Sequence, residues 1–323
     1  MRVRRRTLAF LCIASGFPLS AMGQANRWPE RPIKIIVPYT AGGLTDNLGR
    51  LMAERLRASL SQAVIVENKP GAGSLLGGSL VAKAPADGYT IGIATSSTLG
   101  ISQALFASPP IKVDDLTGLG ILGAVTLVLI AHPEFPAGDF QEALAALKAK
   151  PGEYKIASPG NGTPHHLLSE MLKKRAGVSA LHVPYSGSAQ ALPDLLAGRT
   201  DMMILDASLA LPLVKAGKVK AIATTAPKRS RLLPNVPAMT EVFPDMDLQV
   251  WQGVVGPNGL PADVVARFQG EVTNALAAPE FRSKLLEWGV EPIQMSPSEF
   301  NAMVRRDESR WAELVKLSGA KVD

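Results

Sequence analysis

The stretch Val37-Pro38-Tyr39-Thr40-Ala41-Gly42-Gly43-Leu44-Thr45-Asp46 joins a predicted strand to a predicted helix. A run rich in isoleucine and valine over residues 33–37 indicates a buried strand, and leucines recur at helical spacing over residues 48–60. Thr45 and Asp46 stand at the expected helix start, where capping and acidic residues are favoured. The glycines let a ligand approach the free N–H groups of the first helical turn, which attract anions. The stretch therefore predicts an α/β unit with an anion seat beyond its first strand.

A second loop of the same design follows about 120 residues later. A predicted strand over residues 154–157 leads into Ser158-Pro159-Gly160-Asn161-Gly162-Thr163-Pro164-His165-His166 and then into a helix that Gly177 ends. Thr163 as N-cap and Pro164 at the first helical position form a well-built helix start. Both halves repeat the order strand, glycine loop, helix, strand, glycine turn, helix, strand. This repetition predicts two α/β lobes of like topology, with ligand-binding loops beyond the carboxyl ends of the strands.

The C-terminal part of the chain predicts a return to the first lobe. A strand is expected over residues 251–256, helices over 261–276 and 279–288, and the capping box Ser296–Glu299 opens a last helix. We therefore predict a first lobe of residues 26–124 plus 252–323 and a second lobe of residues 125–251. Two crossings, near residues 124–127 and 248–252, would form a two-strand hinge.

The N-terminal residues 1–25 are typical of a secretory signal peptide cleaved near Gly23–Ala25, because arginines precede a short apolar run and small residues follow it. The apolar run is too short to span a bilayer. Cleavage would lower the net charge from +6 to +2 and would remove the single cysteine, Cys12. The mature chain would then lack a thiol nucleophile, a disulfide and the basic face that a nucleic-acid partner requires.

Seven segments, met in order along the chain, resemble one known family. They are IVPY followed by GGLTD, VIVENKPGAGSLLGG, ADGYTIGIATSS, SPGNGTPHH, HVPYSG, DLLAGRTDMMILD and KRSRLLPNVPAMTE. The chain is similar in these segments to the substrate-binding proteins of tripartite tricarboxylate transporters, the Bug family, from Trp28 to the last helix. The resemblance implies a periplasmic-binding-protein type II-like fold, a periplasmic location and closure of two lobes on a small organic acid.

The resemblance also implies which residues bind the ligand, whose carboxylate is held between the two glycine loops, partly through water. On the first lobe it assigns Tyr39, Gly42, Gly43, Thr45 and Asp46. On the second lobe it assigns Ser158, Gly160, Asn161, Gly162, Thr163 and His166. The rest of the cleft would be lined by Ser96, Ser97, Tyr185, Ser186, Gly187 and Asp206.

The implied ligand is a mono- or dicarboxylate, with aromatic acids and amino acids included. The implied partners are the membrane subunits of a transporter or the ectodomain of a sensor, and the chain would act as a monomer without cofactor, metal or enzymatic activity. The residues support an anion for their own reason. None of the loop motifs contains Arg or Lys, so backbone N–H groups, hydroxyls and helix N-termini would have to hold it.

Three departures from the family pattern concern the ligand more than the fold. Thr40-Ala41 stands where the family often has proline, His165 occupies a variable position, and Pro193 interrupts a predicted helix.

Other interpretations of single motifs are weaker. Gly71-Ala72-Gly73 lacks the spacing of a dinucleotide-binding loop and favours packing between elements. A metal site built on His165, His166 and Glu170 lacks a further ligand, so a polar cleft lining is favoured.

An enzyme is the alternative function, as a secreted hydrolase or transferase on a two-lobed scaffold. Ser158, His182 and Asp206 could form a triad, but no G-x-S-x-G elbow holds the serine. The effector domain of a regulator is excluded by the leader and by the missing DNA-binding helices. Asp206 could bind a ligand amine or hydroxyl or cap the next helix, and Tyr185 and Trp251 could stack on a ligand or belong to the core.

Overall fold

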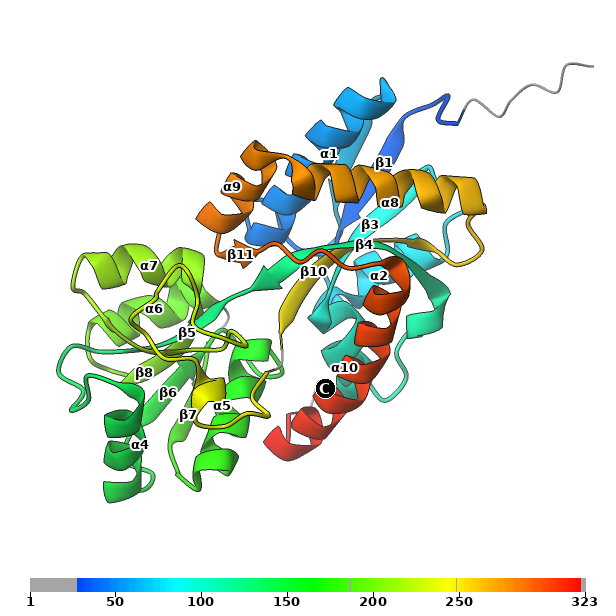
Figure 1. Cartoon of the computed structure of the whole chain (residues 1–323). Coiled ribbons are helices and arrows are strands. Elements are labelled where there is room, and N and C mark those ends of the chain that lie inside the picture. The colour runs from blue at the N-terminus through cyan, green and yellow to red at the C-terminus, as the bar shows by residue number, and fades with distance from the viewer. Residues whose placement is uncertain (1–27, 186, 248, 321–323) are drawn as a thin grey trace, which may run out of the picture.

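The computed structural model describes residues 28–185, 187–247 and 249–320, and the expected signal peptide lies outside them. The described chain forms two α/β lobes, each built on its own sheet (Figure 1). This arrangement confirms the predicted fold class.

The first lobe contains a six-stranded sheet with the order β11-β4-β10-β3-β1-β2. Strands β1, β2 and β3 are parallel, whereas β10 runs antiparallel to both β3 and β4. The strands are β1 (Ile33–Val37), β2 (Val64–Asn68), β3 (Thr90–Thr95), β4 (Leu116–Val125), β10 (Val250–Pro257) and β11 (Val290–Glu291). The helices are α1 (Leu44–Leu60), α2 (Leu75–Ala82), α3 (Ser102–Leu105), α8 (Ala262–Ala277), α9 (Pro279–Glu287) and α10 (Pro297–Ser318), with the short 3-10 helices η1 (Ala72–Ser74) and η3 (Val113–Asp115) and the π-helix η2 (Ser97–Ile101).

The second lobe contains a five-stranded sheet with the order β7-β6-β8-β5-β9. Its strands are β5 (Leu127–Ala131), β6 (Lys155–Ser158), β7 (Leu181–Pro184), β8 (Met202–Asp206) and β9 (Lys220–Thr224). Its helices are α4 (Phe140–Ala149), α5 (Pro164–Ala176), α6 (Ser188–Leu196) and α7 (Ala207–Lys215), followed by the turn η4 (Met239–Glu241).

Helix α1 shows how the sequence pattern builds the first lobe. Leu48, Met52 and Leu56 recur at helical spacing and are fully buried in the core that also holds Ile35 and Val37 of β1. Gly49 lets the helix approach the strand, because a Cβ atom there would lie 2.7 Å from Cγ2 of Val37. The close packing fixes the start of α1 directly above the end of β1.

Two segments connect the lobes, and both adjoin strands of the first sheet. The chain leaves β4 at Thr126 and returns between β9 and β10, and Val125 pairs with Val250 where the two strands meet. Val125 and Val250 thus belong to the first sheet, although the predicted limits assign them to the second lobe. The lobe limits themselves stay a prediction.

The C-terminal helix α10 contacts both lobes. It packs against η2, α3 and β4 of the first lobe and against α5 of the second (Figure 1). Trp311 of α10 is fully buried, and Trp251 of β10 lies edge-on against Phe300 of α10. Trp251 is therefore a core residue. No helix among the described residues combines the length and the apolar character needed to cross a bilayer.

Candidate functional site

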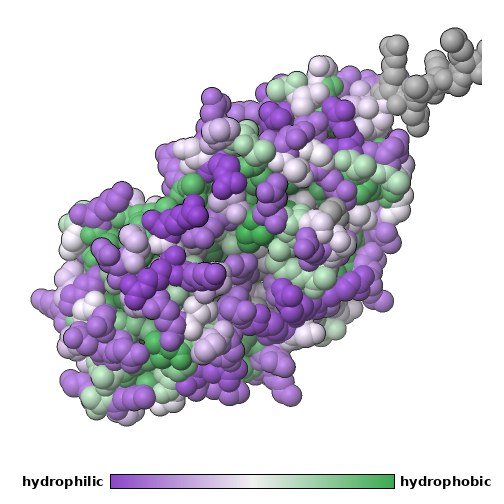
Figure 2. Space-filling model, viewed as in Figure 1, coloured by the Kyte–Doolittle hydropathy of each residue, from purple (hydrophilic) through white to green (hydrophobic). Residues whose placement is uncertain are grey.

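The candidate site is a cavity of about 580 Å³ between the two lobes. Its walls include the loop that follows β1, the starts of α1 and α5, and strand β10 at the hinge. It is lined by Tyr39, Leu44, Thr45, Ala72, Gly73, Thr95, Ser97, Ile101, Ser102, Leu105, Phe106, Val125, Val250 and Gln252, and by Pro159, Asn161, Gly162, Thr163, Pro164, His165, Ser188 and Asp206 from the second lobe. Hydrophilic residues cover much of both lobes on the face shown in Figure 2.

Both glycine loops reach this cavity, although many of the predicted residues do not. The predicted residues that line it are Tyr39, Thr45, Ser97, Asn161, Gly162, Thr163 and Asp206. Those outside its lining are Gly42, Gly43, Asp46, Ser96, Ser158, Gly160, His166, Tyr185 and Gly187. Ser186 lies outside the described residues. The ligand-binding role of all these residues stays a prediction, but several of the second group, Asp46 and His166 among them, have structural roles that the sequence did not indicate.

Asp46 supports the first loop from behind. Its carboxylate is almost fully buried and accepts hydrogen bonds from the amide of Gly42, from Nε of Arg50 and from Nδ2 of Asn68, each at 2.9 Å. Burial raises the pKa of Asp46, but the bonds from Arg50, Gly42 and Asn68 outweigh it and leave the pKa lowered. Because its oxygens are already occupied, Asp46 shapes the loop rather than facing the cavity.

The start of α1 leaves amides free for a ligand. Its N-cap is Gly43, which has no side chain to accept a hydrogen bond from the first turn. The first amides of a helix also lack an acceptor within the helix. Leu44 and Thr45, the first two helical residues, both line the cavity. This helix end thus presents N–H groups and a partial positive charge toward the cavity.

Hydroxyl groups form a polar wall beside this helix start. The hydroxyl of Tyr39 lies 3.2 Å from Oγ1 of Thr95, which also accepts from the amides of Ser97 and Thr98. Thr45 donates through Oγ1 to Oε1 of Gln252 at 3.2 Å. Gln252 was not predicted as a site residue, although a lone amide side chain in an otherwise apolar strand was a usable signal.

The second loop is closed by a helix cap and by an imidazole. Oγ1 of Thr163 accepts from the amide of His166 at 3.3 Å and donates to the carbonyl of Gly160 at 2.8 Å. The amide of Gly162 donates to Nδ1 of His166 at 3.1 Å. Since Nδ1 accepts, neutral His166 carries its proton on Nε2. His166 therefore holds the loop from behind and does not line the cavity.

A second histidine completes this support. The rings of His166 and His182 stack with centroids 3.9 Å apart, and Nε2 of His182 lies 2.6 Å from Oγ of Ser158. Burial, with Lys173 nearby, lowers the pKa of His166 to about 4. Burial, followed by the neighbouring His166, likewise lowers the pKa of His182 to about 4. Both rings are therefore neutral at pH 7.

His166, Glu170 and His182 could bring three ligand atoms within 4.8 Å of one another. The geometry does not favour a shared metal. Glu170 is paired with Nζ of Lys173 at 2.6 Å, and Nδ1 of His166 is occupied by Gly162. A metal ion lies near the plane of each imidazole that binds it, which two rings stacked face to face do not permit.

Ser158, His182 and Asp206 do not form a catalytic triad. Ser158 contacts His182 but is fully buried and does not line the cavity. Asp206 instead lies on the cavity wall near His165. A buried hydroxyl outside the cavity cannot attack a bound substrate, so this arrangement does not support hydrolysis.

The sequence left two possible roles each for Asp206 and Tyr185, and the structure shows the surroundings of both side chains. Asp206 stands at the N-cap of α7, yet its side chain makes no capping hydrogen bond. Tyr185 donates its hydroxyl to Oδ2 of Asp194 at 2.7 Å and does not line the cavity. Asp206 is thus available to a ligand, and Tyr185 is not.

The apolar part of the cavity was also missed from the sequence. Leu105 and Phe106, at the end of α3, line it together with Ile101. Leu105 approaches the opposite loop closely, since a Cβ atom on Gly162 would lie 2.5 Å from its Cδ1. The two lobes therefore meet at Gly162 across the cavity.

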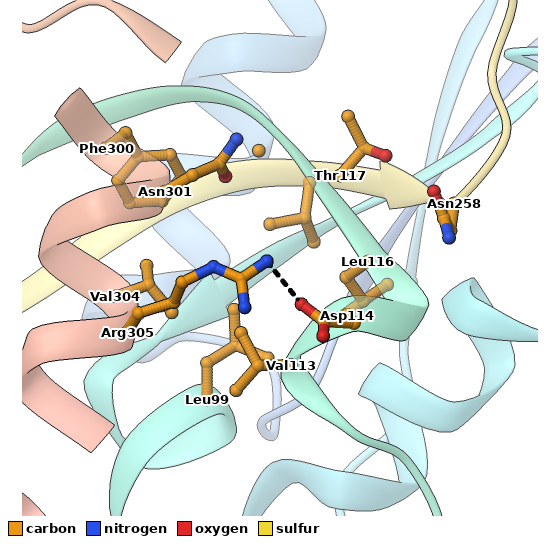
Figure 3. Close-up of a pocket in the computed structure, with 12 residues that line it drawn as sticks. Leu99, Val113, Asp114, Leu116, Thr117, Asn258, Phe300, Asn301, Val304 and Arg305 are labelled. Carbon is orange, nitrogen blue, oxygen red and sulfur yellow. Dashed lines mark ion pairs between the residues drawn. The ribbon is translucent and has the colours of Figure 1, made fainter. Parts of the chain in front are cut away.

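A smaller hollow of about 290 Å³ lies between α10 and the β4 side of the first lobe. Figure 3 shows Arg305 pointing toward Asp114 there, and the two side chains form an ion pair at 2.6 Å. The second lobe contributes no residue to this hollow, and no predicted site residue lines it. We therefore assign the candidate site to the cavity between the lobes.

Comparisons with known proteins agree with this architecture. Residues 48–320 match the family described as tripartite tricarboxylate transporter family receptor. Protein BugT of Bordetella pertussis is 33% identical over 307 residues, which cover 94% of this chain and 94% of BugT. The solved structure of periplasmic binding protein BugD is 33% identical with a TM-score of 0.76, covering 91% of this chain and 99% of that chain. The structure of R. palustris Rpa4515 with adipate is 30% identical with a TM-score of 0.80, covering 91% of this chain and 100% of that chain.

These matches confirm the resemblance predicted from the motifs and the two-lobed, type II-like fold. The chain therefore belongs to the family of tripartite tricarboxylate transporter receptors, to which the Bug proteins belong.

Proposed function

We propose that this protein is a periplasmic receptor that captures a small organic carboxylate between its lobes. It would act as a monomer and deliver the acid to the membrane subunits of a tripartite transporter or report it to a sensor. The observation that carries the proposal is that two glycine loops, one from each lobe, line one cavity through Leu44 and Thr45 and through Asn161, Gly162 and Thr163.

The charge of the cavity lining is consistent with this mode of capture. No Lys or Arg is among the described residues that line it. A carboxylate would therefore be held by the amides at the start of α1 and by neighbouring hydroxyls, where each charge-assisted hydrogen bond contributes about 1.5–3 kcal/mol. Closure of the lobes would exclude water from these bonds and strengthen them. The structure of R. palustris Rpa4515 with adipate, a dicarboxylate, supports an organic acid as ligand.

The proposal is tested by thermal denaturation in the presence of single acids. A ligand that binds only the folded protein stabilises it by about 2.7 kcal/mol at a concentration of 100 Kd. We expect at least one acid from a panel of aliphatic, aromatic and amino-acid carboxylates to raise Tm, with a Kd confirmed by calorimetry. If no acid in the panel raised Tm while the protein melted cooperatively, the proposed function would be wrong.

A further inference from the structure

His165 and Asp206 form a polar pair on the cavity wall of the second lobe. Nε2 of His165 lies 3.6 Å from Oδ2 of Asp206, and the exposed fractions of the two side chains are 12% and 28%. Neither ring nitrogen of His165 has a hydrogen-bond partner among the described residues. Buried polar groups are normally paired, since an unpaired one costs about 1–3 kcal/mol. The pair is therefore incomplete without a further group.

In the part of the chain that the structure describes, no lysine or arginine pairs with Asp206 within the cavity. Its side chain does not cap α7, and no Lys or Arg is among the described residues that line the cavity. A second carboxylate placed here would be repelled at short range, whereas a hydrogen-bond donor would be attracted. The donor must come from the ligand or from water.

The cavity also has an apolar part. Leu44, Ile101, Leu105 and Phe106 line it from the first lobe, and Leu105 closes against Gly162 of the second. Polar atoms placed against these side chains would lose their hydration without compensation. The ligand thus needs an apolar segment besides the polar groups that would contact the start of α1 and the pair of His165 and Asp206.

We propose that His165 and Asp206 form a hydroxyl-binding subsite, so that the preferred ligand is an apolar monocarboxylate with a hydroxyl group remote from its carboxylate. When His165 carries its proton on Nε2, a hydroxyl oxygen about 2.8 Å from both atoms of the pair donates to Asp206 and accepts from His165. A methyl group leaves both residues unpaired, and an ammonium group donates to Asp206 but offers His165 no acceptor in this tautomer. This inference rests on the proposed function and names the ligand class of the same site.

Two matched ligand series test the subsite by calorimetry. The linear series is hexanoate, 6-hydroxyhexanoate, 6-aminohexanoate and adipate, and the aromatic series is 4-methylbenzoate, 4-hydroxybenzoate, 4-aminobenzoate and terephthalate. In the series that fits the cavity, we expect the hydroxy acid to bind at least tenfold more tightly than the methyl-terminated acid and the dicarboxylate. An amino compound or a dicarboxylate as the tightest ligand of its series would overturn the assignment.

Variants separate charge from hydrogen bonding. Asp206→Ala should bring the hydroxy acid to within about threefold of the methyl-terminated acid, and Asp206→Asn should remove most of the penalty on the dicarboxylate. His165→Leu should weaken the hydroxy acid by about tenfold and leave the methyl-terminated acid unaffected or stronger. The control is Asp139→Asn, an exposed aspartate at the start of α4 that lies outside the cavity lining.

The outcomes separate this inference from the proposed function. If acids bind but the hydroxyl preference is absent or survives in Asp206→Ala, the subsite is wrong and the receptor function stands. If no member of either series binds and the broader acid panel is also silent, both are wrong. Thermal melts of the ligand-free variants identify any loss that comes from misfolding.

Discussion

The two loops that face the cavity share a sequence design but are supported by different chemistry. The loop of residues 42–46 is held from behind by a buried carboxylate, Asp46, and the loop of residues 158–166 by a neutral imidazole, His166. Each side chain accepts a hydrogen bond from a glycine amide of its own loop, four residues upstream. The comparison teaches that each glycine loop has an acceptor side chain that fixes its backbone, and that the choice of acceptor sets the response of the loop to pH.

The loops also differ in how closely they approach the opposite lobe. A Cβ atom on Gly42 would meet nothing within 4 Å, whereas one on Gly162 would collide with Leu105 of the first lobe. The second loop therefore contacts the opposite lobe at Gly162, and the first presents its helix start to the cavity. Substitutions should affect closure at one loop and backbone stability at the other.

The largest effect is expected for Gly162→Leu. A side chain at this position must take a φ of +72° and displace Leu105, so the lobes cannot close fully. We expect ligand affinity to fall by at least about a hundredfold, equivalent to about 3 kcal/mol. Calorimetry with the tightest acid from the panel measures the loss.

The matched control for this change is Gly177→Leu, at the end of α5. Its φ of +62° imposes a similar backbone strain, but no atom lies within 4 Å of the added Cβ. The left-handed conformation costs about 1–2 kcal/mol of folding stability in both variants. Equal affinities of the two variants would show that contact across the cavity is not needed for binding.

The second effect is a loss of stability in Asp46→Ala. This change removes the acceptor shared by Gly42, Arg50 and Asn68 and leaves a loop amide unpaired. We therefore expect the free energy of unfolding to fall by about 2–3 kcal/mol. Denaturant unfolding measures the change, and Asp46→Asn should recover part of it. For comparison, Asp114→Ala breaks an exposed ion pair and should cost less than about 1 kcal/mol.

The third effect is a dependence of stability on pH that originates in the second loop. The pKa values of His166 and His182 are about 4 in the folded protein, below their usual 6.5, so the unfolded chain binds more protons between these values. Their contribution is fully present above pH 6.5 and is lost as the pH falls toward 4. We expect a loss on the order of 2 kcal/mol. The free energy of unfolding should be measured from pH 7 to pH 4.

The variant His182→Gln separates this effect from that of the carboxylates. Its free energy of unfolding should change less between pH 6.5 and 4 than that of the unmodified protein. The lowered pKa of Asp46 places the loss of its support below its usual value of 3.8. If the variant and the unmodified protein lost stability in parallel over this range, the histidine pair would not be the cause.

The smallest effect is expected for the helix cap of the second loop. Thr163→Ala removes the acceptor for the amide of His166 and should cost about 1 kcal/mol of folding stability. Thr163→Ser retains the hydroxyl and should stay within a few tenths of a kcal/mol of the unmodified protein. Thermal or denaturant unfolding of the three proteins side by side measures the difference, and a Ser variant as unstable as the Ala variant would contradict the cap.

The local features of the fold were predictable because they depend on residues close together in sequence. Thr163 caps α5, Gly177 ends it in the left-handed conformation, and Ser296 and Glu299 form the predicted capping box. The strand–glycine loop–helix units also form where the periodicity places them. The family motifs are concentrated in these local units, so the sequence alone indicates the fold class.

The orientation of side chains at the cavity was not predictable from local sequence. The sequence predicts that Asp46 faces a ligand. Hydrogen bonds from Asn68, at the end of the next strand, and from Arg50, one helical turn further on, instead hold its carboxylate inside the loop. Tyr185 was expected in the cleft, but Asp194 holds its hydroxyl. The burial of His166 against His182 likewise depends on the neighbouring strand β7.

By itself the sequence determined two α/β lobes and two glycine-lined helix starts, and it predicted an anion seat without fixed positive charge. Only the tertiary structure decided which polar groups remain free to bind. It paired Thr45 with Gln252, brought Leu105 against Gly162, and left His165 and Asp206 incomplete on the cavity wall. The physical reason is that hydrogen bonds within one helical turn are set by local spacing, whereas contacts between distant segments arise only when both lobes are packed.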